Sequence, residues 1–186
     1  MKKSILSCAI CLCLLAQAAM TQDRGKAHVK VPIIPAKPED VSNIEAIVTA
    51  SYEAISGGLG VPRQWARERT LNDAHARFVA ADVDPKTGET KGWSTNDQEY
   101  ADQTNDSMVK DGFTEGEIRH VIHRYGNVAT VLSSYEGKSQ RTGKVIDRGV
   151  NIFQLYFDGK RWWILSIIWD SERAGNPIPA ELLPGN

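Results

Sequence analysis

The sequence predicts an α+β fold, because helix-type patterns dominate its first half and strand-type patterns its second. Between residues 42 and 111, apolar side chains recur mostly every three or four positions, as on one face of a helix. Between residues 117 and 170, short runs of β-branched and aromatic residues alternate with turn signals. Helices followed by an antiparallel sheet, without regular alternation of the two, indicate an α+β domain.

Two helices are expected before residue 72. The first, residues 42–56, begins at a capping box of Ser42 and Glu45 and ends at a Gly-Gly pair. The second is shorter and covers residues 62–71, because Pro62 fits the first position of a helix. Together these helices supply one apolar layer.

A strand and a third helix are expected next. Residues 75–81 alternate in polarity and predict a short strand, and residues 84–92 form a turn-rich excursion. A helix is then expected over residues 95–111, with Thr95 and Gln98 as its capping box.

Four strands of an antiparallel meander complete the domain. Gly126-Asn127 and Asp158-Gly159 are typical two-residue hairpin turns, and a longer polar loop separates the two hairpins. The expected strands are residues 117–125, 128–136, 148–157 and 161–170. The Pro-broken tail is expected to pack over one edge of the sheet.

The last hairpin places large apolar groups on both of its faces. If Asp158 and Gly159 alone form the turn, one face carries Asn151, Phe153, Leu155, Trp162, Ile164 and Ser166. The other face carries Arg148, Val150, Ile152, Gln154, Tyr156, Arg161, Trp163, Leu165, Ile167 and Trp169. In this register Arg148 lies over Trp169 as a cation–π pair, and Gln154 lies against Trp163.

Neither face of this hairpin is suited to water. The helices cover one side of the sheet, and contiguous apolar groups on the other side usually mark association. A homodimer through the outer face, the face turned away from the helices, is therefore expected. The alternative is that the N-terminal lead-in and the C-terminal tail cover this face within one chain.

The first residues have the pattern of a secretory signal peptide. Lys2 and Lys3 precede an apolar run over residues 5–15, and Ala16-Gln17-Ala18 has small residues where signal peptidase cleaves. The run is short for a membrane span, so a retained anchor is the lesser alternative. The expected division is a signal peptide at 1–18, an extended lead-in at 19–41, a domain at 42–173 and a tail at 174–186. An exported protein, periplasmic or secreted and not bound to membranes after cleavage, is expected.

Composition excludes several classes of function for the mature chain. All three cysteines lie inside the signal segment, so thiol nucleophiles, thiolate metal sites and disulfides are excluded after cleavage. Without Lys2 and Lys3, 20 basic side chains face 23 acidic ones, and no basic stripe indicates nucleic-acid binding. No metal site is expected, because His120 and His123 lie three apart on a strand and face opposite sides. No cofactor is expected.

The order of elements over residues 40–172 resembles the nuclear transport factor 2-like superfamily, with its ketosteroid isomerases, polyketide cyclases and scytalone dehydratase. The Trp162-Trp163-Ile164 segment of the final hairpin is similar to that group's Trp-x-Ile pattern. Segments such as GFTEGEI, RYGNVATVLSSYE and ERAGNPIPAELL resemble bacterial members of unassigned function. The resemblance implies a cystatin-like cone, in which a curved, mainly antiparallel sheet folds around the helices and encloses a pocket.

The resemblance also implies roles for the two faces of the hairpin. The expected ligand-binding residues, on the inside of the cone, are Asn151, Phe153, Trp162, Ile164 and Ser166. The expected dimer-interface residues are Arg148, Gln154, Tyr156, Trp163 and Trp169. Family enzymes use an Asp or His at the mouth of the cone as general base, so His75, with Asp73 or Asp170, is the catalytic candidate. Each of these three also fits a turn or a solvated strand end, and Glu115 and Glu117 are expected to be solvated.

Three functions remain open at this point. The first is an exported, dimeric protein that binds a small apolar molecule, with no established catalysis. The second is an enzyme of the isomerase, dehydratase or cyclase type that uses His75 and an Asp. The third is a protein-interaction module whose cone is filled by its own side chains, Trp162, Phe153 and Tyr52 among them.

Overall fold

The computed structural model describes residues 28–84 and 86–185. The expected signal peptide and the first part of the lead-in lie outside the described residues. Within them, no helix is long and apolar enough to cross a membrane. The helices are α1 (Ile44–Ile55), α2 (Trp65–Leu71) and α3 (Asp97–Asp111), with 3-10 turns η1 (Pro38–Val41) and η2 (Ala180–Leu182). The strands are β1 (Asn72–Val83), β2 (Thr90–Thr95), β3 (Phe113–Tyr125), β4 (Val128–Ser139), β5 (Val145–Phe157) and β6 (Trp162–Ser171).

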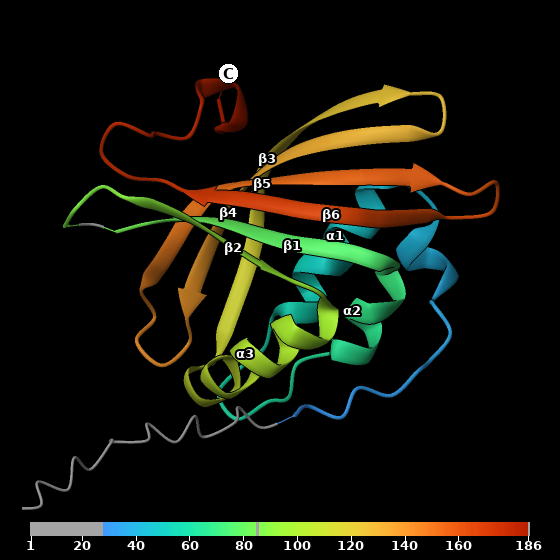
Figure 1. Cartoon of the computed structure of the whole chain (residues 1–186), viewed down its shortest axis with the longest axis horizontal. Coiled ribbons are helices and arrows are strands. Elements are labelled where there is room, and N and C mark those ends of the chain that lie inside the picture. The colour runs from blue at the N-terminus through green and yellow to red at the C-terminus, as the bar shows by residue number, and fades with distance from the viewer. Residues whose placement is uncertain (1–27, 85, 186) are drawn as a thin grey trace, which may run out of the picture.

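The six strands form one sheet in the order β2-β1-β6-β5-β4-β3. All neighbouring pairs are antiparallel except β1 and β6, which are parallel. Figure 1 shows the sheet strongly twisted, with the three helices gathered against one side, the inner face, and the C-terminal segment beyond the other, the outer face. This arrangement confirms the predicted α+β class.

The meander of four strands was predicted correctly, but the sheet is larger than expected. The segment from Thr90 to Thr95 forms strand β2, where the sequence indicated the end of a turn and the start of a helix. Thr95 pairs with Phe78, so its backbone is extended, and α3 begins two residues later. The capping box of α3 is therefore Asn96 with Glu99, and the predicted box at Thr95 is wrong.

The N-terminus of α1 also differs from the prediction by one residue. Asn43 is the N-cap, and its side-chain oxygen accepts a hydrogen bond of 2.7 Å from the backbone N–H of Ala46. Asn43 has the extended backbone conformation that an N-cap requires, whereas Ser42 is helical and closes the preceding 3-10 turn.

The register predicted for the last hairpin is wrong, for two reasons. The connection uses four residues, because the Asp158 carboxylate accepts hydrogen bonds of 2.8 Å from the backbone N–H groups of both Lys160 and Arg161. Phe157 consequently pairs with Trp162. A β-bulge follows at Leu165, where the pairing changes from Leu155–Ile164 to Gln154–Ser166.

The bulge exchanges the faces of the second half of β6, since one extra residue reverses the alternation. Trp162 and Ile164 lie on the inner face as predicted, but beyond the bulge Ile167 and Trp169 take that face. Ser166 lies on the outer face, where its hydroxyl donates to the side-chain oxygen of Gln154 at 2.9 Å. Trp162 and Trp163 do lie on opposite faces, as predicted.

The hydrophobic core lies between α1 and the inner face of the sheet. Tyr52 of α1 contacts Phe153 edge to face, with ring centroids 6.0 Å apart. Trp162 packs against Phe157 at 5.6 Å and closes the core at the end of the last hairpin. Leu71 and Ile164 are fully buried between these aromatic pairs.

The tail covers part of the outer face. Ile178 and Leu182 are buried, and the Ser134 hydroxyl donates to the Leu182 carbonyl at 2.6 Å. The first described residues of the lead-in lie elsewhere, because the backbone N–H of Val29 donates to Asp102 of α3 at 2.7 Å. Within the described residues, the tail therefore covers part of the outer face, and lead-in residues Ile33 and Ile34 lie beside Trp163 at its edge.

Candidate functional site

A cavity of about 210 Å³ lies between the helices and the inner face of the sheet. Its walls are mainly aromatic and apolar, with Tyr52, Phe78, Tyr100, Phe113, Tyr135, Phe153, Ile167 and Trp169 among them. Three carboxyl groups also line it, those of Glu68, Glu115 and Asp147. Apolar walls with a few convergent polar groups are typical of a ligand site.

Glu115 enters the cavity from the beginning of β3. The Asn151 side-chain N–H donates to Glu115 Oε1 at 3.2 Å. Dehydration by the surrounding side chains raises the pKa of Glu115 to about 8, and the nearby charge of Asp147 adds to this effect. Glu115 lines the cavity, and with this raised pKa it is a proton-holding group there at neutral pH.

Glu68 enters from α2 and is more deeply buried, with 4% of its surface exposed. The Asn72 side chain donates to its Oε1 at 3.3 Å, whereas Oε2 has no hydrogen-bond partner among the described residues. Burial raises the pKa of Glu68 to about 8, against the lowering effect of the neighbouring Asn72 and Ser51 side chains. An unpartnered buried carboxyl oxygen is unusual in a folded protein.

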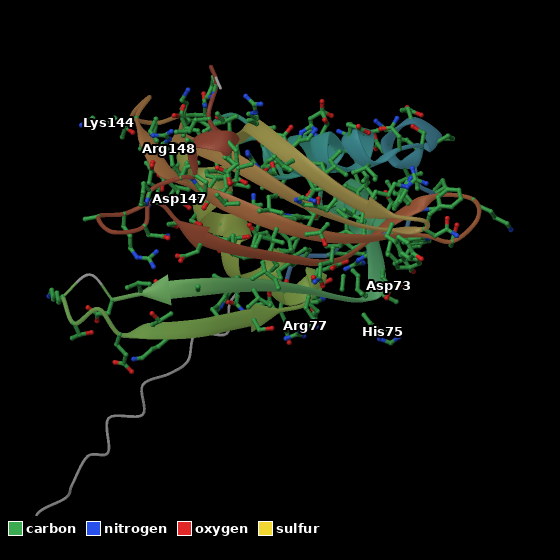
Figure 2. The ribbon with its side chains drawn as sticks, turned by 90° about the horizontal axis from the view of Figure 1, so that it is seen from above. Asp73, His75, Arg77, Lys144, Asp147 and Arg148 are labelled. Carbon is green, nitrogen blue, oxygen red and sulfur yellow. The ribbon has the colours of Figure 1, made fainter. Side chains whose placement is uncertain are left out.

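The third carboxyl belongs to Asp147 on β5. The Tyr135 hydroxyl donates to Asp147 Oδ2 at 2.9 Å, and burial together with this charge raises the pKa of Tyr135. Figure 2 shows Asp147 at one end of the molecule, beside Arg148 on the same strand. The Arg148 side chain lies on the outer face of the sheet, where it forms ion pairs with Glu136 and Glu172.

A chain of hydrogen bonds leads from the cavity to the rim of the sheet. Asn151 donates to the Tyr52 hydroxyl at 3.1 Å, which lies 2.7 Å from the Ser133 hydroxyl. Ser133 donates to Glu117 at 2.5 Å, and Glu117 also binds the ring of His120 at 2.8 Å. These contacts fix Asn151 and Tyr52 in the wall of the cavity.

The predicted ligand-binding residues lie in three different places. Asn151 and Phe153 line the cavity, whereas Trp162 and Ile164 lie on the same inner face but are packed inside the core. Ser166 is on the outer face, because of the bulge in β6.

The predicted catalytic candidates lie away from the cavity. His75 is exposed on β1, and its backbone N–H donates to Asp73, which also accepts a bond of 2.6 Å from Tyr156. Figure 2 shows Asp73 and His75 together at the end of the molecule opposite Asp147. Asp170, near the end of β6, accepts hydrogen bonds from the side chains of Arg173 and Asn176, which follow the strand. The expectation that His75 reaches the cavity is wrong, since its position on β1 turns it outward.

The predicted interface residues lie on the outer face, with one exception. Arg148, Gln154, Tyr156 and Trp163 face outward, and the Arg161 guanidinium covers the Trp163 ring at 3.6 Å. Trp169 lies inside instead, where its ring contacts Trp93 at 5.9 Å and Tyr100 at 6.4 Å. The predicted stacking of Arg148 on Trp169 is therefore absent.

Sequence reasoning missed the acidic residues of the cavity. Glu115 was expected in solvent, because Thr114, Gly116 and Glu117 around it are polar. Glu68 lies on a short helix with charged neighbours and gives no sequence signal of burial. Asp147 lies between the expected loop and the strand expected over residues 148–157, and in the structure it belongs to the beginning of β5.

The comparisons with known proteins concern the fold. No family model matches the chain, and no curated protein is significantly similar in sequence. Among solved structures, a protein of unknown function with a cystatin-like fold from Nostoc punctiforme is 11% identical, with a TM-score of 0.52, over 81% of this chain and 98% of that one.

Two other solved structures resemble the chain less closely. One is an NTF2-like protein of unknown function from Methylobacillus flagellatus, with 13% identity and a TM-score of 0.45 over 69% of this chain and 89% of that one. The other is the β subunit of benzoate 1,2-dioxygenase from Burkholderia mallei, with 18% identity and a TM-score of 0.44 over 64% and 84%. The Nostoc punctiforme structure confirms the predicted resemblance at the level of architecture, and the chain has the cystatin-like fold.

Proposed function

We propose that the protein is an exported, nuclear transport factor 2-like protein that binds a small, largely apolar molecule in the cavity between the helices and the sheet. The observation that supports this most is the cavity itself, with aromatic walls and convergent polar groups. A dry cavity of about 150 Å³ holds a benzene ring, so one of 210 Å³ has room for one substituted ring. Export rests on the pattern of residues 1–18, and the intact mass of the mature protein tests it.

A second candidate function is acid–base catalysis in the same cavity. A carboxyl group with a pKa of about 8 is suited to hold and transfer a proton near neutral pH, and Glu115 takes the place proposed for His75. A pure interaction module is disfavoured, because Phe153 and Tyr52 line the cavity without filling it.

The cavity is tested with two neighbouring isoleucines on opposite faces of β6. Ile167 is 8% exposed and lines the cavity, whereas Ile168 is 37% exposed on the outer face. Ile167→Phe fills the cavity and is expected to weaken binding of toluene at least tenfold, as measured by ligand-observed NMR. Ile168→Phe is the control and is expected to bind toluene like the wild type.

The same pair of variants tests for a natural ligand. Small molecules are extracted from each purified, denatured protein and identified by mass spectrometry. A compound released by the wild type and Ile168→Phe, but not by Ile167→Phe, is the expected result. If toluene binds none of the three proteins and none releases a compound, the cavity is not a ligand site.

The homodimer remains part of the proposal, with a revised interface. Cross-strand partners place Leu132, Ile152, Ile168 and Val79 in one row across the outer face, beside the part that the tail covers. Ile168 is exposed to 37% in the isolated chain, which supports a partner at this row.

Ile168→Glu is expected to convert a dimer into a folded monomer, because it puts a charge into the center of this row. Analytical ultracentrifugation gives the mass, and circular dichroism checks the fold. Lys160→Glu, which changes an exposed turn, is the control and is expected to leave the dimer intact. A wild-type protein that sediments as a monomer at millimolar concentration contradicts this interface.

A further inference from the structure

The charge of the cavity is one-sided. Glu68, Glu115 and Asp147 line it, and none of the described lining residues is Lys, Arg or His. The three carboxyls come from α2, β3 and β5, so elements far apart in the sequence bring them to one space. Burial raises the pKa of the Tyr100 hydroxyl, and the carboxyls of Glu115, Glu68 and Asp147 add to this effect.

The apolar part of the cavity is mostly aromatic. The Tyr100 ring packs against Phe78 at 5.2 Å and Trp169 at 6.4 Å, and all three line the cavity. Its hydroxyl makes no hydrogen bond within the described part of the chain. Aromatic faces attract cations, and the attraction is strongest where water is excluded.

Glu68 gives the second, independent indication of a ligand. Its Oε2 is buried and has no hydrogen-bond partner in the described structure, although a buried carboxyl oxygen without one is costly. A neutral hydrocarbon in the cavity leaves this oxygen unpaired, and a carboxylate or phosphate anion offers it acceptor oxygens in place of a donor. A ligand with N–H donors and positive charge satisfies it.

From this arrangement, and resting on the proposed function of the cavity, we infer that the ligand is a small ammonium compound with an apolar ring. Its protonated nitrogen lies among Glu68, Glu115 and Asp147, and its ring lies against Phe78, Tyr100 and Trp169. The volume of the cavity limits the ligand to one ring with a short substituent.

The affinity of the cavity for an ammonium ligand depends on pH. Burial raises the pKa of Glu68 and of Glu115 to about 8, so both hold their protons in the empty cavity at neutral pH. An ammonium group favours the ionised carboxylate, so its binding releases a proton. Affinity therefore rises with pH up to about 8, by about tenfold per pH unit for one released proton. The titratable groups that face these two carboxyls are Asp97, Asp147, Arg67, Tyr52, Tyr100 and Tyr135.

The test compares benzylamine, which is protonated at pH 6.5 to 8, with ethylbenzene, its neutral isostere. Isothermal titration calorimetry is run at both pH values and in two buffers of different ionisation enthalpy. We expect benzylammonium to bind at least tenfold more tightly than ethylbenzene at pH 8, to weaken at pH 6.5 and to release a proton. Ethylbenzene is expected to show no such pH dependence.

Glu115→Gln removes one of the two titrating carboxyls while keeping its shape. It is expected to lower benzylammonium affinity at least tenfold at pH 8, to flatten the pH profile and to leave ethylbenzene unchanged. Glu136→Gln is the matched control, because it removes the same charge from a carboxylate that pairs with Lys138 and Arg148 instead. Glu68→Gln is a second variant in case Glu115→Gln unfolds, and thermal melting checks both.

The outcomes separate the two proposals. If ethylbenzene binds as tightly as benzylammonium at pH 8, the cavity is a ligand site but the inference of a cationic ligand is wrong. Equal loss of benzylammonium affinity in Glu115→Gln and Glu136→Gln also overturns it. If neither compound binds and no molecule co-purifies, both the inference and the proposed function fail.

Discussion

Arg63→Ala is expected to lower the free energy of unfolding by about 3 kcal/mol, because it removes several hydrogen bonds that a buried, charged guanidinium donates to backbone carbonyls. Arg63 is only 5% exposed, between the end of α1 and the beginning of β3. Its guanidinium donates to the carbonyls of Phe113 at 2.9 Å, Gly58 at 3.0 Å and Val61 at 2.5 Å.

Urea denaturation measures the effect, with Arg77→Ala as the control. Arg77 is exposed on β1, and among the described residues its guanidinium is bonded only to the Ser94 hydroxyl. Its removal is therefore expected to change stability by less than about 0.5 kcal/mol. Arg63→Lys keeps the charge but not the planar fork of donors, and an intermediate loss is expected. Equal midpoints for Arg63→Ala and Arg77→Ala contradict this account.

The same arginine connects stability to the cavity. The backbone groups of Gly57 and Phe113 bond to each other at 2.6 and 3.0 Å, and Arg63 supports this bridge from the side. Two residues further along β3 lies Glu115. The network around Arg63 therefore fixes the place where β3 enters the cavity, and Arg63→Ala is expected to weaken ligand binding even at temperatures where it stays folded.

Much of the fold was predictable, because periodicity and turn residues are local properties. Helix α1, the hairpin turn at Gly126-Asn127 and the opposite positions of Trp162 and Trp163 all follow from patterns a few residues long. The bulge at Leu165 does not, since it depends on how β6 meets β5 on one side and β1 on the other. That one residue moved Trp169 and Ser166 to the opposite faces.

The candidate site was less predictable than the fold for a physical reason. Glu68 and Glu115 become cavity residues only when α2 and β3 are packed against the same sheet, and their neighbours in sequence are polar. Asn151 was the exception. Its apolar neighbours on β5 showed that it is buried, and burial of an amide requires partners, which Tyr52 and Glu115 supply.

Gly149→Ala is expected to destabilise the protein by about 3 kcal/mol, since a side chain there overlaps the neighbouring strand. A Cβ on Gly149 lies 2.3 Å from the Asp170 carbonyl oxygen, 2.9 Å from the Tyr135 hydroxyl and 3.0 Å from Ser171 Cα. Two of these atoms are backbone, so β5 and β6 must separate. The Tyr135 hydroxyl is also displaced from Asp147, so one wall of the cavity changes.

Gly116→Ala is the matched control, because Gly116 is also a strand glycine but a Cβ there meets nothing within 4 Å. This variant is expected to unfold at the same urea concentration as the wild type or a slightly higher one, since alanine restricts the unfolded chain. If Gly149→Ala is as stable as Gly116→Ala, the two strands do not approach as closely as described. If only Gly149→Ala loses much of its free energy of unfolding, the close contact of β5 and β6 is the feature that holds Tyr135 and Asp147 at the cavity.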